Sequence, residues 1–221
     1  MKRIISLIIC AVVVLSLSAC GEGNTKKDNS NDVVAHGAES NFEWDGNLIV
    51  GLTEEGCRAK ELVIPERCEG FGGSIFIGKD NAVETVSFSN NNDISLNGVF
   101  AGAKKIKSVT LPTGLTEIGN MDFWLCEALE EINIPASVVT IGEAAFQDCS
   151  KLKKVVLGEA TKDIQEYAFD GCESLDTVIL SDGIETIGEY AFYECVSLKA
   201  ITLPKSLKDI GKFAFANGGL T

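Results

Sequence analysis

TVILSDGIETIGEYAFYECVSLK, residues 177–199, is the stretch that decides the fold of this chain, because close variants of it follow one another without a gap. The further copies are residues 108–130, 131–153, 154–176 and 200–221, with a weaker copy at residues 85–107 and a shifted one that begins at Glu61. A unit of 23 residues cannot bury its apolar side chains alone. The repetition therefore predicts a stack of copies that share one continuous core.

Several apolar columns recur at fixed positions of these copies. Val178 and Leu180 alternate with outward residues, as does the matching pair of every copy, and this is the pattern of a short strand. Two further columns are Phe100, Phe123, Phe146, Phe169, Phe192 and Phe215, and Ile118, Ile141, Ile164, Ile187 and Ile210. Glycine follows most of these isoleucines, which favours a tight corner. We expect a predominantly β solenoid with one short strand per repeat and short helical or 3-10 turns around residues 189–195.

The repeat pattern I-x-I-P-x-S-V-x-x-I-G-x-x-A-F-x-x-C-x-x-L resembles that of the BspA-like leucine-rich repeat family of bacterial surface proteins. Residues 131–152 match the pattern almost position for position, and the resemblance extends over residues 42–221. Gly158 and Ser181 depart from its proline column, and Gln165 departs from its glycine column. These departures concern local geometry and leave the overall pattern intact.

This resemblance implies a domain organisation and a class of function. The implied fold is a leucine-rich-repeat solenoid over residues 85–221, preceded by an N-terminal capping segment with a shifted first repeat over residues 41–84. The implied activity is adhesion to host proteins, matrix proteins or other cells.

The N-terminus has the pattern of an exported lipoprotein. Lys2 and Arg3 precede an apolar run over residues 4–17, which is short for a membrane span but typical of a secretory signal. The following Leu-Ser-Ala-Cys ends at Cys20 and resembles a bacterial lipobox, in which the cysteine is lipidated after cleavage. We therefore predict a signal peptide over residues 1–19 and a lipid anchor on Cys20 at the bacterial envelope. An ordinary cleaved signal with an incidental cysteine is the alternative.

The next segment, residues 20–40, is polar and charged and has too little apolar area to fold alone, which predicts a flexible tether. It contains His36, the only histidine of the chain, which we interpret as a solvated bystander. Loss of the signal would leave 17 of the 19 basic residues against 32 acidic ones, a formal charge of −15. Such an acidic chain is a poor partner for nucleic acid, since phosphate binding needs clustered lysine and arginine.

Cysteines form a column of their own in the repeats, made up of Cys126, Cys149, Cys172 and Cys195. Ala103 and Gly218 occupy the same position in the outer copies, which indicates a slot for small side chains. Buried thiols are our interpretation, although adjacent rungs would also bring cysteines to a disulfide separation. Cys57 and Cys68 are better candidates for a disulfide. The spacing does not match a zinc site, and no histidine joins the column.

Catalytic and cofactor motifs are missing from the sequence. It contains no G-x-S-x-G, H-E-x-x-H or P-loop pattern, no calcium loop, and no histidine outside the tether that could act as a base. We therefore expect no enzyme activity, no metal site and no cofactor.

The outward positions of the repeats supply two candidate binding surfaces. Val156 and Ile179 should lie side by side on the strands, either as a partner contact or as β-branched residues that merely suit a strand. A second column reads Met121, Ala144, Tyr167, Tyr190 and Phe213, with Trp124 and Tyr193 sharing a neighbouring one. Its rings could hold a sugar or a protein strand, or could cover the outer side of the solenoid. The favoured hypothesis is a non-catalytic binding module, and structural self-assembly in the envelope is the alternative.

Overall fold

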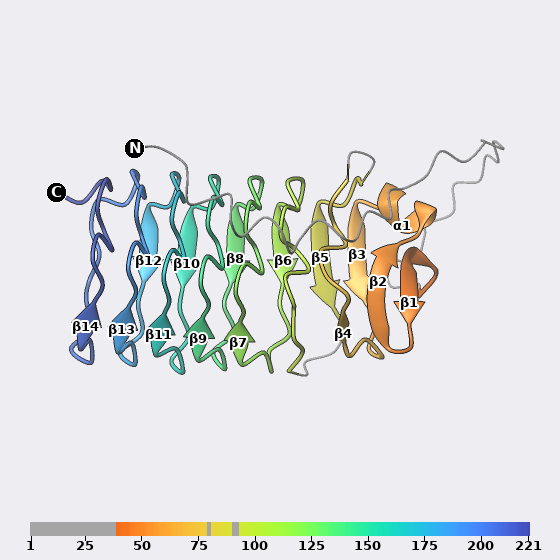
Figure 1. Ribbon diagram of the computed structural model, residues 1–221, viewed down its shortest axis with the longest axis horizontal. Helices are drawn as coiled ribbons and strands as arrows, with labels where there is room; N and C mark the ends of the chain where they lie inside the picture. Colours follow the sequence, from red (N-terminus) through yellow and green to blue (C-terminus); the bar gives the residue numbers. More distant parts are fainter. Residues whose placement is uncertain (1–38, 79–80, 90–92) are drawn as a thin grey trace.

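The computed structural model describes residues 39–78, 81–89 and 93–221, which form one elongated stack of rungs, each rung being one 23-residue turn of the chain (Figure 1). The predicted signal peptide, Cys20, His36 and most of the predicted tether lie outside the described residues. The architecture is almost entirely β, as the repeats predicted. Among the described residues, no helix has both the length and the hydropathy to cross a membrane.

The first sheet has six parallel strands in the order β12-β10-β8-β6-β5-β3. Its strands are β3 (Glu61–Ile64), β5 (Thr85–Phe88), β6 (Ser108–Thr110), β8 (Glu131–Asn133), β10 (Lys154–Val156) and β12 (Thr177–Ile179). Equivalent residues of neighbouring copies pair directly, so that Val155 faces Ile132 on one side and Val178 on the other. The strand predicted in each copy is thus confirmed through residue 179, whereas residues 200–203 of the last copy form no strand.

A second sheet lies along the other edge of the rungs, and the sequence analysis did not predict it. Its five parallel strands have two residues each: β7 (Glu117–Ile118), β9 (Thr140–Ile141), β11 (Asp163–Ile164), β13 (Thr186–Ile187) and β14 (Asp209–Ile210). The regular rungs therefore contain two short strands rather than one. The isoleucine column supplies the inward residue of the first four of these strands, since Ile118, Ile141, Ile164 and Ile187 are at most 1% exposed, whereas Ile210 in β14 is 43% exposed.

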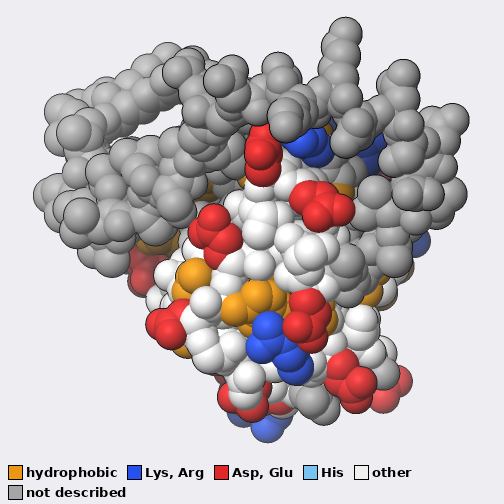
Figure 2. Space-filling model, turned by 90° about the vertical axis from the view of Figure 1, so that its right-hand side faces the viewer, with side chains coloured by type: hydrophobic (Ala, Val, Ile, Leu, Met, Phe, Trp, Pro, Cys, Tyr) orange, Lys and Arg blue, Asp and Glu red, His pale blue; other side chains and the backbone are white. Residues whose placement is uncertain are grey.

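The N-terminal end of the stack is closed by a separate small sheet of order β1-β2-β4. It consists of β1 (Phe42–Asp45), β2 (Leu48–Leu52) and β4 (Gly70–Phe71), with a 3-10 turn η3 (Glu39–Asn41) and one helical turn α1 (Glu54–Arg58) beside it. The Arg67 guanidinium lies 3.5 Å from the ring centre of Trp44 and forms an ion pair of 2.9 Å with Glu39. Figure 2 shows this end, where charged side chains surround a small group of hydrophobic ones.

The outer side of the rungs consists of consecutive turns rather than the helical or 3-10 turns that we expected there. Two residues of each regular rung adopt a left-handed backbone, for example Tyr167 (φ 56°) and Gly171 (φ 70°). This conformation turns their N–H groups toward the next rung, where Tyr167 N donates to Glu189 O at 3.0 Å and Gly171 N to Tyr193 O at 2.9 Å. Because these donors bond between rungs rather than within one, a helix does not form.

A stack of phenylalanine rings runs through the core. Successive rings are nearly parallel and their centroids are 4.9 to 5.3 Å apart, in the order Phe76, Phe100, Phe123, Phe146, Phe169, Phe192 and Phe215. Six of these rings were predicted from the column. Phe76 was missed because it lies 24 rather than 23 residues before the next ring.

The cysteine column forms a buried thiol ladder beside this stack. Cys126, Cys149, Cys172 and Cys195 are at most 1% exposed and are free thiols. Each donates to a phenylalanine carbonyl of the preceding rung at 3.1 to 3.2 Å, as Cys149 Sγ does to Phe123 O. Burial raises the pKa of the Cys195 thiol to about 12. Cys68 keeps its thiol hydrogen and donates it to Gly70 O, so the candidate disulfide between Cys57 and Cys68 is not formed.

Candidate functional site

The predicted aromatic column forms a stack of its own on the outer side of the last three rungs. The rings of Tyr167 and Tyr190 are 5.1 Å apart and parallel to within 4°, and Phe213 continues the stack 5.2 Å beyond Tyr190. Tyr193 contacts Tyr190 edge to face at 5.3 Å. The tyrosines are half-buried, while Phe213 is 57% exposed. We call Tyr167, Tyr190 and Phe213 the aromatic stack.

The backbone of this column is held in place by hydrogen bonds between rungs. Tyr167, Tyr190 and Phe213 all have a positive φ of 55 to 57°, a conformation that costs an ordinary residue roughly 1–2 kcal/mol. The N–H groups of Tyr167 and Tyr190 are directed at the carbonyls of Glu189 and Lys212, each at 3.0 Å. Ala144 occupies the same column with φ 53°, so this backbone does not itself require a ring.

Hydroxyl groups and carboxylates are the polar groups of this surface. Within the described part of the chain, the hydroxyls of Tyr167 and Tyr190 have no hydrogen-bond partner, whereas the Tyr193 hydroxyl accepts from Asn217 Nδ2 at 2.6 Å. The pKa of Tyr167 is raised by partial burial, by Tyr190, and by the negative charges of Glu166, Glu189 and Asp170. The stack therefore lies in a field of negative potential.

Asp170 lies close enough to Tyr167 for its charge to act on the tyrosine, and its own carboxyl group has a raised pKa. Burial raises the pKa of its carboxyl group to about 6, although a hydrogen bond of 2.7 Å from Gln147 Nε2 acts in the opposite direction. The nearby charges of Asp148 and Glu194 raise this pKa further. In the ion pairs of the described residues, no lysine or arginine pairs with Asp170 or Glu194.

The second predicted surface, Val156 and Ile179, lies on the outer face of the first sheet. The two residues are direct partners of β10 and β12, so the predicted neighbourhood is confirmed. Val156 is 36% exposed and Ile179 is 49% exposed. Asn133 precedes them in the same outward row. The continuous apolar part of this face is therefore the pair Val156 and Ile179, since polar residues separate it from Val63 at the N-terminal end of the row.

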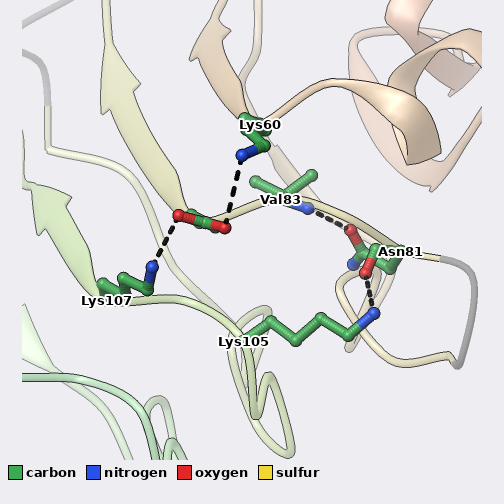
Figure 3. Close-up of polar contacts among 6 residues, drawn as sticks. Lys60, Asn81, Val83, Lys105 and Lys107 are labelled. Carbon is green, nitrogen blue, oxygen red and sulfur yellow. Dashed lines mark hydrogen bonds and ion pairs between the residues drawn. The ribbon is translucent and has the colours of Figure 1, made fainter.

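An alternating row of charges lines the start of the strands in the first sheet. Lys60 and Lys107 approach the carboxylate of Glu84 from two sides, at 4.0 and 2.7 Å (Figure 3). Two rungs further, Glu130 pairs with Lys153 at 2.9 Å. The same close-up shows Lys105, which donates to the backbone oxygen of Asn81 at 2.7 Å, while the Asn81 side chain accepts from Val83 N at 2.9 Å. These lysines already have partners within the chain, so this region is structural.

Asp122 is a buried carboxylate that the sequence analysis did not single out. It is 2% exposed and accepts hydrogen bonds from Gly98 N at 2.7 Å and Gly119 N at 2.6 Å. Its column contains alanine in the later copies, for example Ala145 and Ala168, so the change from alanine to aspartate was the available signal. One of these donors belongs to the rung of Asp122 and the other to the preceding rung, so the carboxylate links two rungs and does not face an open site.

Acidic groups and thiols, the side chains that bind metal ions or act as nucleophiles, are spread along the described rungs. Within residues 39–78, 81–89 and 93–221, no three or more His, Cys, Asp or Glu side chains converge as metal ligands. The buried thiols are protonated donors, and burial keeps the pKa of Cys149 and Cys172 well above the ordinary value.

Comparison with known proteins identifies the class. Residues 55–153 and 116–221 match the family described as the BspA type leucine rich repeat region, in six copies. The chain therefore belongs to the BspA-type leucine-rich repeat family, which confirms the resemblance seen in the repeats. No curated protein matches the sequence significantly.

Solved structures agree with this assignment. The leucine-rich repeat protein of T. pallidum is 25% identical, with a TM-score of 0.72 over 81% of this chain and 87% of that one. A leucine-rich repeat protein from Bacteroides ovatus is 24% identical, with a TM-score of 0.51 over 78% of this chain and 45% of that one. The first of these similarities covers nearly the whole of both chains, so the solenoid described above is the fold of the family.

Proposed function

We propose that this chain is a non-catalytic binding module of the bacterial cell surface, which holds a protein or glycan through an exposed side of its solenoid. The main support is the aromatic stack, an exposed row of rings repeated at about 5 Å along a rigid scaffold. Membership of a repeat family that includes bacterial surface-type proteins is consistent with this role. Val156 and Ile179 form the alternative contact surface.

The first experiment measures binding of the purified full chain to immobilised matrix proteins, envelope polysaccharides and the chain itself. Two variants accompany it. Tyr167→Ala/Tyr190→Ala removes two rings, and its stability should be close to that of the parent because alanine already occupies this backbone at Ala144. Val156→Thr/Ile179→Thr removes the apolar contact on the sheet. Threonine is chosen because the same outward row already contains it at Thr110.

Each outcome of this experiment is informative. Loss of binding in the tyrosine variant alone assigns the site to the aromatic stack, and loss in the threonine variant alone assigns it to the sheet. Failure of the parent chain to bind any of these surfaces would contradict the proposal.

The proposed location is a lipid anchor through Cys20 on the bacterial surface. Metabolic labelling with an alkyne fatty acid should mark the parent chain and leave a Cys20→Ala variant unmarked. Protease treatment of intact cells should then remove the solenoid from the parent strain. Unlabelled parent chain would argue against the anchor without affecting the binding proposal.

Self-association in the envelope is a second candidate. Several apolar side chains of the last described rung are well exposed, since Leu203 is 44% and Ile210 is 43% accessible. Apolar surface of this kind supports contact with another rung, including one from a second copy. A chain that stays monomeric in light scattering across a wide concentration range would exclude this candidate.

A further inference from the structure

The central ring of the aromatic stack presents its edge rather than its faces to a partner. Tyr190 has Tyr167 on one face at 5.1 Å and Phe213 on the other at 5.2 Å. Ala144, the preceding residue of the column, has no ring, so the stack ends at Tyr167 on that side. A sugar that stacks on an aromatic residue needs an uncovered ring face, and among the three rings the central one offers none. This geometry is unfavourable for a glycan.

The exposed groups around Tyr167 and Tyr190 are hydrogen-bond acceptors and negative charges, whereas Lys212 holds the equivalent position before Phe213. The hydroxyls of Tyr167 and Tyr190 have no partner among the described residues, and a tyrosine hydroxyl can accept a hydrogen bond. Glu166 and Glu189 immediately precede the two tyrosines in the chain, and their charges act on Tyr167 together with that of Asp170. The ligand group that best complements this surface is a positively charged hydrogen-bond donor.

We propose, on the basis of the function proposed above, that the aromatic stack and its flanking carboxylates bind lysine and arginine side chains of a partner protein. The ammonium or guanidinium group donates to the tyrosine hydroxyls and to Glu166 and Glu189. The methylene stem of the same side chain packs along the ring edges. Charge-assisted hydrogen bonds of this kind are roughly twice as strong as neutral ones, and they supply the selectivity for a basic segment.

The electrostatics of the region support the same partner. Partial burial, Tyr190 and three carboxylates raise the pKa of Tyr167, which shows that negative charge is disfavoured at its hydroxyl. The whole chain has a formal charge of −13, so a basic partner is also attracted at long range, most strongly at low salt.

The test uses the purified full chain and a short fluorescent glycine-serine peptide with spaced arginines as the probe. The same peptide with citrulline in place of arginine removes the charge while preserving the shape. Neutral glucan oligosaccharides form a third arm. We expect the arginine peptide to bind with an affinity that falls as salt is added, and we expect neither the citrulline peptide nor the glucan to bind.

Variants separate the proposed site from the general acidity of the chain. Glu166→Gln/Glu189→Gln should weaken peptide binding about tenfold or more, since charge-assisted bonds are lost. The matched control is Glu61→Gln/Glu131→Gln, which removes the same charge from the exposed side of the first sheet and should change affinity by less than about twofold. Tyr167→Leu/Tyr190→Leu keeps the net charge and should also weaken binding.

Three results would overturn the inference: equal losses in the two glutamine variants, unchanged binding in the leucine variant, or binding of the glucan but not the arginine peptide. Either of the first two results would mean that the peptide is held by non-specific electrostatic attraction. The third result would mean that the surface binds a glycan. None of them would by itself refute the broader binding proposal, which fails only if the parent chain binds no immobilised partner.

Discussion

The rungs from β6 to β13 and the rungs before them share one core but differ in how their backbones are joined. In residues 108–199 each rung contributes a strand to both sheets, and carbonyls of one rung accept N–H groups of the next. In the described part of residues 61–107, β3 and β5 extend only the first sheet, and β7 is the first strand of the second. The phenylalanine stack nevertheless continues through Phe100 to Phe76.

Asp122 lies at the boundary between these two regions. In the regular rungs the glycine of the corner donates to the preceding isoleucine carbonyl, as Gly142 N does to Ile118 O at 2.8 Å. At the boundary Gly119 N donates to the Asp122 side chain instead. A carboxylate thus replaces backbone acceptors where the second sheet begins. A continuous core is therefore sufficient to extend the stack. Where the backbone ladder of the second sheet is lost, a side chain takes over as hydrogen-bond acceptor, as Asp122 does for Gly119 N.

The largest effect is expected when the shared core is interrupted. Phe169→Ala removes a fully buried ring from the middle of the stack and should lower the free energy of unfolding by roughly 3–5 kcal/mol. Because each rung contacts only its neighbours, urea denaturation followed by circular dichroism should show two transitions instead of one. Phe76→Ala, at the irregular end, is the control and should leave a single main transition. A single cooperative transition in the Phe169 variant would show that the parts of the stack on either side of Phe169 do not unfold separately.

The next effect concerns the boundary and is a pH dependence. Burial raises the pKa of Asp122 to about 6 against an ordinary 3.8, although the hydrogen bonds from Gly98 and Gly119 lower it. The folded chain therefore binds this proton more tightly than the unfolded chain does. The contribution to stability is present below pH 3.8 and is lost as the pH rises to about 6, by roughly 3 kcal/mol for a shift of this size.

Asp122→Asn should remove this contribution. The difference in unfolding free energy between parent and variant, measured from pH 4 to pH 7, should change in favour of the variant as the pH rises. Asp170, whose pKa is also raised to about 6, acts in the same direction in both proteins and cancels in the difference. A difference that does not vary with pH would contradict the role of Asp122.

A smaller effect should distinguish close packing from open turns. A Cβ atom at Gly188 would lie 2.6 Å from the carbonyl carbon of Gln165 in the preceding rung, whereas one at Gly98 would meet nothing within 4 Å. Gly188→Ala should therefore cost about 1–3 kcal/mol because neighbouring rungs must separate. Gly98→Ala should cost only the left-handed backbone penalty at φ 69°, about 1–2 kcal/mol. Thermal unfolding of the two variants measures the loss of stability at each position. A greater loss in the Gly98 variant than in the Gly188 variant would contradict the prediction.

The smallest effect is expected from the charged row. The hydrogen bond and the charge of Lys153 hold the pKa of Glu130 below its usual range, yet both side chains are well exposed. Glu130→Gln should therefore lower the melting temperature only slightly, and the decrease should disappear at high salt because exposed pairs are screened. A large decrease that persists in high salt would mean that this row holds the rungs together.

The amino-acid sequence predicted those features that depend on one rung at a time. The columns of Phe146, Ile141 and Cys149 were all expected inside, and each of these residues is fully buried. The contact of Val156 with Ile179 also followed from the period, since equivalent positions of adjacent rungs must be neighbours. Phe76 was missed because the interval between it and Phe100 is one residue longer than the repeat period.

What only the tertiary structure decided depends on the relation between rungs. The second sheet, the thiol donor of Cys149 to Phe123 O and the bond from Gly98 N to Asp122 all join residues 23 to 26 positions apart. The repeat period determined by the sequence establishes that such residues are close. It does not establish which donor meets which acceptor, because that depends on the backbone angles of the intervening turn. For the same reason the sequence placed Tyr167 and Tyr190 in one column, while the fold decided that rings cover both faces of Tyr190 and that neither tyrosine hydroxyl has a hydrogen-bond partner among the described residues.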